Sequence, residues 1–119
     1  MYFNKAKKNL YALGRLKTGE RNKTEAAYEK HLELLKTAGE ISWYCFEGLK
    51  LRLADNTFYS PDFFVMNKDG QLEAHEVKGY MLEDANVKLK IAAEKFPFKF
   101  FIVRAITKKN GGGFSIVEV

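Results

Sequence analysis

The stretch Tyr59–Tyr80, YSPDFFVMNKDGQLEAHEVKGY, decides the fold because it predicts two strands joined by a tight turn. Its first half is largely apolar, residues 67–70 have the Asn, Asp and Gly composition of a turn, and its second half returns as a strand. The stretch nevertheless carries Asp62 near its start, and Glu76 and Lys78 near its end. Charged side chains are rarely buried in a hydrophobic core unless they are paired, so these three residues are candidates for a functional site.

The register of this hairpin determines whether the two carboxylates meet. A two-residue turn would put Asp62 out of phase with Glu76. A three-residue loop that ends at Gly70 instead pairs Asn67 with Gln71, and Asp62 then lies directly opposite Glu76. Glycine suits the left-handed conformation in which such loops often end. We therefore predict the three-residue loop, or a bulge with the same effect.

Two opposed carboxylates are suited to a divalent cation. Residues i and i+2 of a strand share a face, so Lys78 points to the same side as Glu76. The carboxylates repel each other, and burial raises that cost unless positive charge lies between them. Mg²⁺ prefers oxygen ligands, needs only one or two carboxylates, and can then hold a phosphate and activate a water. The alternative is a surface hairpin in which Lys78 forms an ordinary salt bridge with Glu76 or Asp62.

The flanking residues favour a site over an ordinary salt bridge. Pro61 fixes the backbone just before Asp62, and the apolar residues 63–65 follow directly. Gly79 ends the strand just after Lys78, which would let a phosphate approach.

The rest of the chain predicts helices and strands around this hairpin, in the order α, β, β, β, β, α, β, β. Asn22 and Glu25 have the spacing of a capping box at the start of the first helix. The second helix allows a right-handed crossover from the hairpin to a parallel strand. We therefore expect an α/β fold, a mixed β-sheet flanked by helices. The expected helices span residues 22–39 and 82–96, and the expected strands span residues 41–46, 49–53, 58–66, 71–78, 98–103 and 114–119.

Length and composition point to one soluble domain. The chain has 119 residues, which leaves little room for a second core. Cys45 is the single cysteine, so no disulfide can form, and a cysteine-based zinc site would lack ligands because only His31 and His75 could join it. No apolar run approaches the roughly 20 residues of a membrane helix. We expect a cytoplasmic protein with no membrane partner.

Positive charge is concentrated at the N-terminus. The formal net charge is +5, and residues 1–21 form a basic arm ahead of a domain that spans residues 22–119. A basic arm on a nearly neutral body suggests a polyanionic partner, although a solubilising tail would have the same composition. Lys88, in the second helix, could reach a phosphate or could pair with Asp84 four residues earlier. If the partner is a nucleic acid, the expected contacts are Arg15, Lys17, Arg21, Lys23 and Lys88.

The charged residues of the hairpin resemble those of a known group of enzymes. Pro61-Asp62, a short hairpin and then Glu76-Val77-Lys78 resemble the signature of the PD-(D/E)XK, or restriction-endonuclease-like, nuclease superfamily. The superfamily core, α-β-β-β-α-β, is contained in the expected elements from residue 22 to residue 103, which have one additional strand. More narrowly, NKTEAAYEKHLELLKTAGEI, LRLADNTFYSPDF, HEVKGY and DANVKLK resemble a small phage-encoded nuclease family related to Holliday-junction resolvases.

The resemblance implies roles for individual residues. Asp62 and Glu76 would bind Mg²⁺, with Mn²⁺ as a substitute, and the carbonyl of Val77 would complete the metal shell. Lys78 would position the attacking water or stabilise charge on the phosphate. Many members add a glutamate from the first helix, which would be Glu25 or Glu29; we favour Glu25, whose alternative role is the capping box.

The expected function is therefore that of a metal-dependent DNA endonuclease acting on branched or junction DNA. The resemblance also implies a homodimer and a host bacterial cytoplasm. A rival hypothesis is a catalytically silent protein on a nuclease fold, which binds nucleic acid or blocks a host factor. His75 is not expected to be a general base, because it faces away from Glu76 and should be a partly exposed strand residue.

Overall fold

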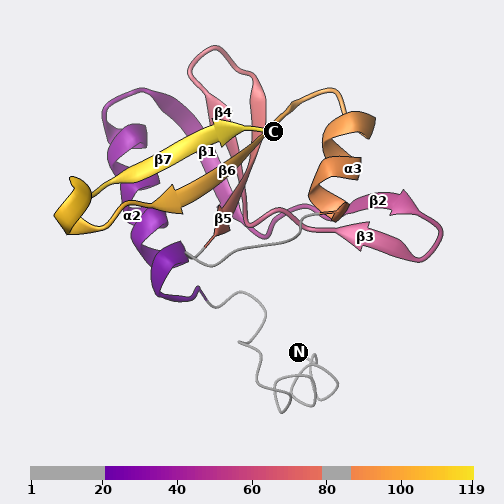
Figure 1. The fold of residues 1–119 in the computed structure, drawn as a ribbon. Coiled ribbons are helices and arrows are strands. Elements are labelled where there is room, and N and C mark those ends of the chain that lie inside the picture. The colour runs from indigo at the N-terminus through magenta and orange to yellow at the C-terminus, as the bar shows by residue number, and fades with distance from the viewer. Residues whose placement is uncertain (1–20, 79–86) are drawn as a thin grey trace, which may run out of the picture.

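The computed structural model describes residues 21–78 and 87–119, and Figure 1 shows their arrangement. The basic arm lies almost wholly outside the described residues, as does the segment between the hairpin and the second helix. The described elements, in chain order, are α2 (Lys23–Thr37), β1 (Ile41–Phe46), β2 (Leu51–Ala54), β3 (Thr57–Tyr59), β4 (Phe63–Asn67), β5 (Leu72–Lys78), α3 (Val87–Lys95), β6 (Lys99–Ala105), the 3₁₀ helix η1 (Lys108–Asn110) and β7 (Phe114–Glu118).

The expected mixed sheet flanked by helices is confirmed. Five strands form the main sheet in the order β1-β4-β5-β6-β7. β5 and β6 are parallel, as the helical connection between them predicts, and the other neighbours are antiparallel. β2 and β3 form a separate two-stranded hairpin that projects beside the main sheet (Figure 1).

The first helix begins where its capping residues predict. The side chain of Asn22 accepts a hydrogen bond from the backbone N–H of Glu25 at 2.8 Å. The Glu25 carboxylate in turn accepts from the backbone N–H of Asn22 at 2.9 Å. Both halves of the capping box are therefore formed. On the inner face of the helix, Tyr28 and Leu32 are fully buried.

The main sheet has a hydrophobic core on each of its two faces. On one face, Tyr28 and Leu32 of α2 pack in a cluster that includes Phe63 and Val77. On the other face, Phe64 belongs to a second cluster, together with side chains of α3 and the β2–β3 hairpin. Alternate residues of β4 and β5 thus serve different cores, because successive side chains of a strand point to opposite faces.

The predicted register of the β4–β5 hairpin is confirmed. Phe63 pairs with His75, and the backbone N–H of Asn67 donates to the carbonyl of Gln71 at 2.9 Å. Gly70 ends the loop with φ of +81°, a left-handed conformation that glycine adopts without strain.

The expected single strand over residues 58–66 is wrong, because the structure divides it. Tyr59 ends β3, Phe63 begins β4, and residues 60–62 lie between the two strands. Pro61 explains the break, since it has no N–H for a ladder hydrogen bond and restricts the residue before it. β3 consequently pairs with β2 instead of extending the main sheet.

The described part of helix α3 agrees with the expected second helix. Its first described residue is Val87, and the expected residues 82–86 lie outside the described part of the chain. Among the residues that the structure describes, no helix is long and apolar enough to cross a membrane.

Removing the cap of α2 should weaken the fold. Substituting Asn22→Ala should lower the free energy of unfolding by about 1 kcal/mol, because the first turn loses a side-chain acceptor for an otherwise unpaired N–H. Urea titration followed by circular dichroism measures this change. The matched control is Asn22→Ser, which keeps a capping oxygen and should stay close to the wild type. Equal stability of the Ala and Ser variants would show that the cap contributes nothing.

Candidate active site

The hairpin register brings Asp62 and Glu76 together at one end of the sheet. Asp62 lies one step before the pair formed by Phe63 and His75, and Glu76 lies one step after it. The Oδ2 atom of Asp62 accepts a hydrogen bond of 2.8 Å from the backbone N–H of Val77. This bond fixes the carboxylate of Asp62 against β5, beside Glu76.

The carboxylate of Glu76 is held from two sides. The hydroxyl of Tyr59 donates to its Oε1 atom at 2.6 Å. The ammonium of Lys78 lies 3.8 Å from its Oε2 atom, as the shared face of the strand predicts. The Glu76 side chain is 18% exposed and that of Lys78 is 30% exposed, so the amine can still reach a molecule in solvent.

Burial raises the pKa values of both carboxyl groups, and nearby negative charge adds to the rise. The pKa of Asp62 rises to about 8, first because the group is buried and second because of the charge of Glu76. The hydrogen bond from Val77 opposes this rise but does not cancel it. The pKa of Glu76 is also raised by burial, although the Tyr59 hydroxyl and the Lys78 charge oppose the rise. Both groups therefore lie where more positive charge would be stabilising.

Tyr59 remains a hydrogen-bond donor throughout the physiological pH range. Burial, the charge of Glu76 and the hydrogen bond to Glu76 all raise the pKa of its hydroxyl well above the ordinary value. The sequence pattern places Tyr59 in a strand and indicates no functional role for it. Residues 60–62, with Pro61 among them, separate β3 from β4, so Tyr59 belongs to the β2–β3 hairpin when it contacts Glu76.

Of the two candidate glutamates in α2, Glu25 faces the site. Its carboxylate contributes to the raised pKa of both Asp62 and Glu76. Glu29 instead accepts hydrogen bonds from Arg21 and from the hydroxyl of Tyr44, the latter at 3.1 Å. Glu25 therefore combines its capping role with proximity to the candidate site.

The donor set at the site fits a hard divalent cation. Within residues 21–78 and 87–119, no group of three or more His, Cys, Asp and Glu side chains is arranged to hold a metal ion. Mg²⁺ does not need such a group, because it is commonly bound by one or two carboxylates and retains several waters. Asp62 and Glu76 supply two carboxylates, each with acceptor capacity beyond the hydrogen bonds described above.

The expected nucleic-acid contacts differ in their surroundings. Arg21 pairs with Glu29, and its guanidinium lies 4.4 Å from the centre of the Phe46 ring. Lys23 and Lys88 are exposed near the first turns of α2 and α3. Arg15 and Lys17 lie outside the described residues.

The expectation of a partly exposed His75 is wrong. His75 is 5% exposed and lies on the α2 face of the sheet, opposite to the face of Glu76. One ring nitrogen contacts the Tyr28 hydroxyl at 2.7 Å and the other contacts the Glu73 carboxylate at 3.0 Å. These two partners satisfy the buried imidazole, so its role in this chain is structural.

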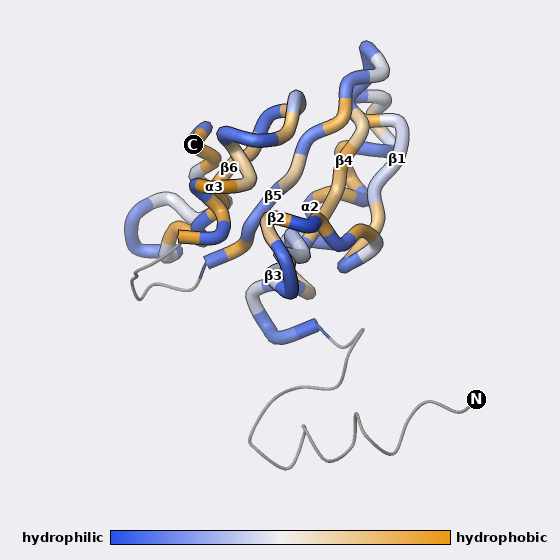
Figure 2. The backbone as a smooth tube through the Cα atoms, turned by 90° about the vertical axis from the view of Figure 1, so that its right-hand side faces the viewer, coloured by the Kyte–Doolittle hydropathy of each residue, from blue (hydrophilic) through white to orange (hydrophobic). Residues whose placement is uncertain are grey.

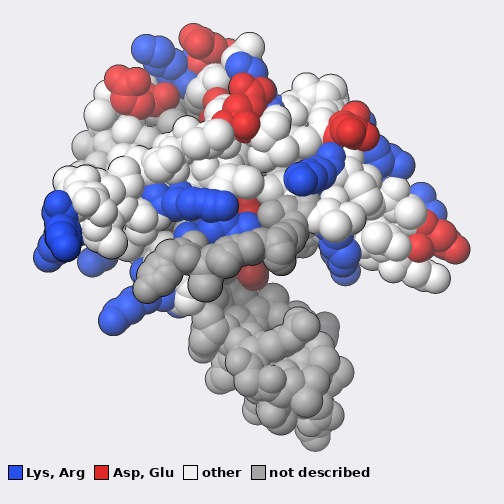
Figure 3. Space-filling model, viewed as in Figure 1, with Lys and Arg blue, Asp and Glu red and all other residues white. Residues whose placement is uncertain are grey.

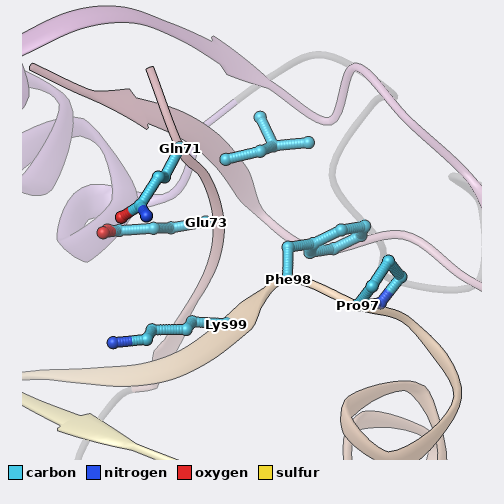
Figure 4. Close-up of a pocket in the computed structure, with 6 residues that line it drawn as sticks. Gln71, Glu73, Pro97, Phe98 and Lys99 are labelled. Atoms are coloured by element: carbon cyan, nitrogen blue, oxygen red, sulfur yellow. The ribbon is translucent and has the colours of Figure 1, made fainter. Parts of the chain in front are cut away.

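A pocket at the other end of β5 does not belong to the candidate site. Figure 4 shows the side chains of Gln71, Glu73 and Lys99 beside Pro97 and Phe98. These residues lie at the beginning of β5 and β6, whereas Lys78 ends β5. The pocket therefore lies at the opposite end of β5 from Lys78 and the paired carboxylates.

The carboxylate of Asp62 should destabilise the fold as the pH rises. Its pKa is about 8 in the folded chain and near 4 in an unfolded chain, so folding favours the protonated form. The stability that this preference contributes is present below about pH 4 and is lost between pH 4 and pH 8. In EDTA, Asp62→Asn should therefore unfold at a higher temperature than the wild type at pH 8, and the difference should shrink at pH 5.

Thermal unfolding at the two pH values measures this difference. One kcal/mol corresponds to a shift of roughly 4–8 °C in a small domain. Asp69→Asn is the matched control, since Asp69 is an exposed residue of the β4–β5 turn. A pH-independent difference between Asp62→Asn and the wild type would contradict the raised pKa.

Comparison of the chain with protein-family models, with curated proteins and with solved structures found no match. A function must therefore rest on the chemistry of Asp62, Glu76, Lys78 and the residues that hold them.

Proposed function

We propose that this protein is a metal-dependent DNA endonuclease that hydrolyses phosphodiester bonds. The observation that carries the proposal is the convergence of Asp62 and Glu76, two partly buried carboxylates with raised pKa values, beside the amine of Lys78. Two such groups are costly to keep together unless a cation binds them. Perturbed carboxylates of this kind cluster at functional sites.

The proposed metal ligands are Asp62, Glu76 and the carbonyl of Val77. Mg²⁺ is the expected ion and Mn²⁺ the expected substitute, because carboxylate and carbonyl oxygens suit both. When bound, such an ion acts as a Lewis acid on a phosphate oxygen and lowers the pKa of water. The residues of this chain hold the two carboxylates in register: Val77 donates to Asp62, and Tyr59 donates to Glu76.

Lys78 is suited to act on the phosphate itself. Its position near Glu76 keeps the amine at the site, and its partial exposure leaves it accessible to a substrate. We assign it to orienting the attacking water and to stabilising the negative charge that develops on the phosphate. In the reaction, a water oxygen forms a bond to phosphorus, one phosphate-ester bond breaks, and a proton passes to the departing sugar oxygen.

Glu25 is proposed as the additional acidic residue of the site. Its charge acts on both Asp62 and Glu76, and the capping box fixes its side chain at the start of α2. In this position it can accept a proton from water or hold a water of the metal shell.

DNA is the proposed substrate, because a net charge of +5 favours a polyanionic partner and a phosphodiester suits the proposed metal site. A branched or junction form, a homodimer and a location in a host bacterial cytoplasm are proposed on the sequence resemblance. The proposed DNA contacts remain Arg15, Lys17, Arg21, Lys23 and Lys88.

Cleavage should require both the amine of Lys78 and a divalent ion. We expect the wild type to cut linear, flap or four-way-junction DNA in Mg²⁺ or Mn²⁺ but not in EDTA. Lys78→Ala should lower the cleavage rate by at least about 100-fold, since it removes charge stabilisation from the transition state. Lys68→Ala, in the exposed β4–β5 turn, is the matched control and should cut normally. Equal cutting by Lys78→Ala would assign the activity to another site or to a contaminant, and binding without cutting in any metal would favour the catalytically silent alternative.

The hydroxyl of Tyr59 should determine how tightly the metal binds. Tyr59→Phe removes the hydrogen bond to Glu76, and loss of a residue that orients a ligand typically weakens metal affinity by roughly 10–100-fold. Titration calorimetry with Mn²⁺ measures this change without any need for cleavage. Tyr44→Phe is the matched control, because the Tyr44 hydroxyl binds Glu29 and Glu33 instead. Unchanged Mn²⁺ affinity in Tyr59→Phe would limit Tyr59 to packing the hairpin.

A further inference from the structure

The β2–β3 hairpin has two faces with different chemistry. Leu51 pairs with Tyr59, and both side chains pack in the core beneath the hairpin, where Tyr59 reaches Glu76. Arg52 pairs with Phe58, so these two side chains share the opposite, outer face. One hairpin therefore contacts the candidate site on one side and solvent on the other.

The outer face presents two cations around an exposed aromatic ring. The Phe58 residue is 37% exposed, and the Arg52 side chain is 64% exposed. The ammonium of Lys50 lies 4.9 Å from the centre of the Phe58 ring. Asp55, in the turn of the hairpin, lies 3.6 Å from the Arg52 guanidinium and is 91% exposed, which is the geometry of a weak surface pair that Arg52 can leave.

The β2–β3 hairpin lies near the end of the main sheet at which the candidate site is formed. In Figure 1, the hairpin projects sideways near the level of the carboxyl end of β5, with α3 above it. Figure 2 is turned about the vertical axis, and there too β3 lies near the level of that end of β5. Helix α3 contacts both strands of the hairpin, on the face that carries Leu51 and Tyr59. In the space-filling view, both basic and acidic side chains are visible around the hairpin (Figure 3).

We propose that the outer face of the β2–β3 hairpin, formed by Lys50, Arg52 and Phe58, binds a single-stranded segment of the nucleic-acid substrate. Lysine and arginine contact phosphates, and an exposed aromatic ring stacks on an unpaired base. Paired bases of a duplex are not available for such stacking, so the ring selects an unpaired segment. An acidic protein partner would use the two cations but would gain nothing specific from a ring that stacks on bases. The inference rests on the proposed function, because it places the strand that enters the site beside Tyr59 and Glu76.

Binding measurements on two outer-face variants test the proposal. Fluorescence anisotropy of a labelled oligothymidine, in EDTA and at several salt concentrations, measures affinity without cleavage. The double variant Lys50→Ala/Arg52→Ala should reduce the slope of log affinity against log salt by about 0.7 for each lost phosphate contact. Lys68→Ala/Lys30→Ala removes two exposed lysines elsewhere and should leave the slope closer to that of the wild type.

The aromatic ring should affect affinity but not the salt slope. Phe58→Ala should weaken oligothymidine binding by roughly 5- to 100-fold, the loss expected for one stacked base. Phe58→Trp should restore binding, and a blunt duplex should respond little to either change. Unchanged oligothymidine affinity in Phe58→Ala, or an unchanged salt slope in the double variant, would overturn the proposal, and a loss confined to an acidic polypeptide probe would assign the face to a protein.

The outcome is separable from that of the nuclease proposal. If the wild type cleaves DNA in a Lys78-dependent way while the outer-face variants bind oligothymidine normally, only the hairpin inference fails. If the outer-face variants lose binding while the wild type cleaves nothing in any metal, the hairpin inference stands and the nuclease proposal fails. Circular dichroism and thermal unfolding confirm that each variant is folded.

Discussion

The candidate site depends on the register of one antiparallel hairpin, β4–β5. The Asn67 side chain accepts hydrogen bonds from the backbone of Asp69 and Gln71, and Gly70 supplies the left-handed residue that the loop needs. A slip of one residue would send every side chain of a strand to the other face and would separate Asp62 from Glu76. The turn therefore specifies the geometry of carboxylates that lie at the opposite end of both strands.

The same register brings two negative charges together, which is unfavourable for the stability of the fold. Asp62 and Glu76 repel each other in a partly buried place, and the hydrogen bonds from Val77 and Tyr59 offset only part of that cost. The two apolar cores on either side of the sheet supply the stabilisation that this arrangement lacks. A loss of stability at a few polar groups is typical of functional sites.

The small β2–β3 hairpin connects that site to the surface. Pro61 separates it from β4, and its Tyr59 then reaches back to Glu76 while the neighbouring Phe58 faces solvent. The hairpin thus has one face against a carboxylate of the candidate site and the other face against solvent, so the proposed binding of a nucleic acid to its outer face would act next to Glu76. His75, by contrast, is committed to the other face, where Tyr28 and Glu73 hold it.

Local sequence patterns determined several features of this protein, because each depends on residues close together in the chain. Asn22 and Glu25 specify the start of α2, β-forming residues specify β1, and the turn residues specify the register that pairs Asp62 with Glu76. The tertiary structure alone decided the features that depend on packing between distant segments: the contact of Tyr59 with Glu76, the burial of His75 against Tyr28, and the proximity of Glu25 to Asp62. Periodicity assigns a residue to a face, but only the packing of a helix or hairpin on that face decides which atoms meet there.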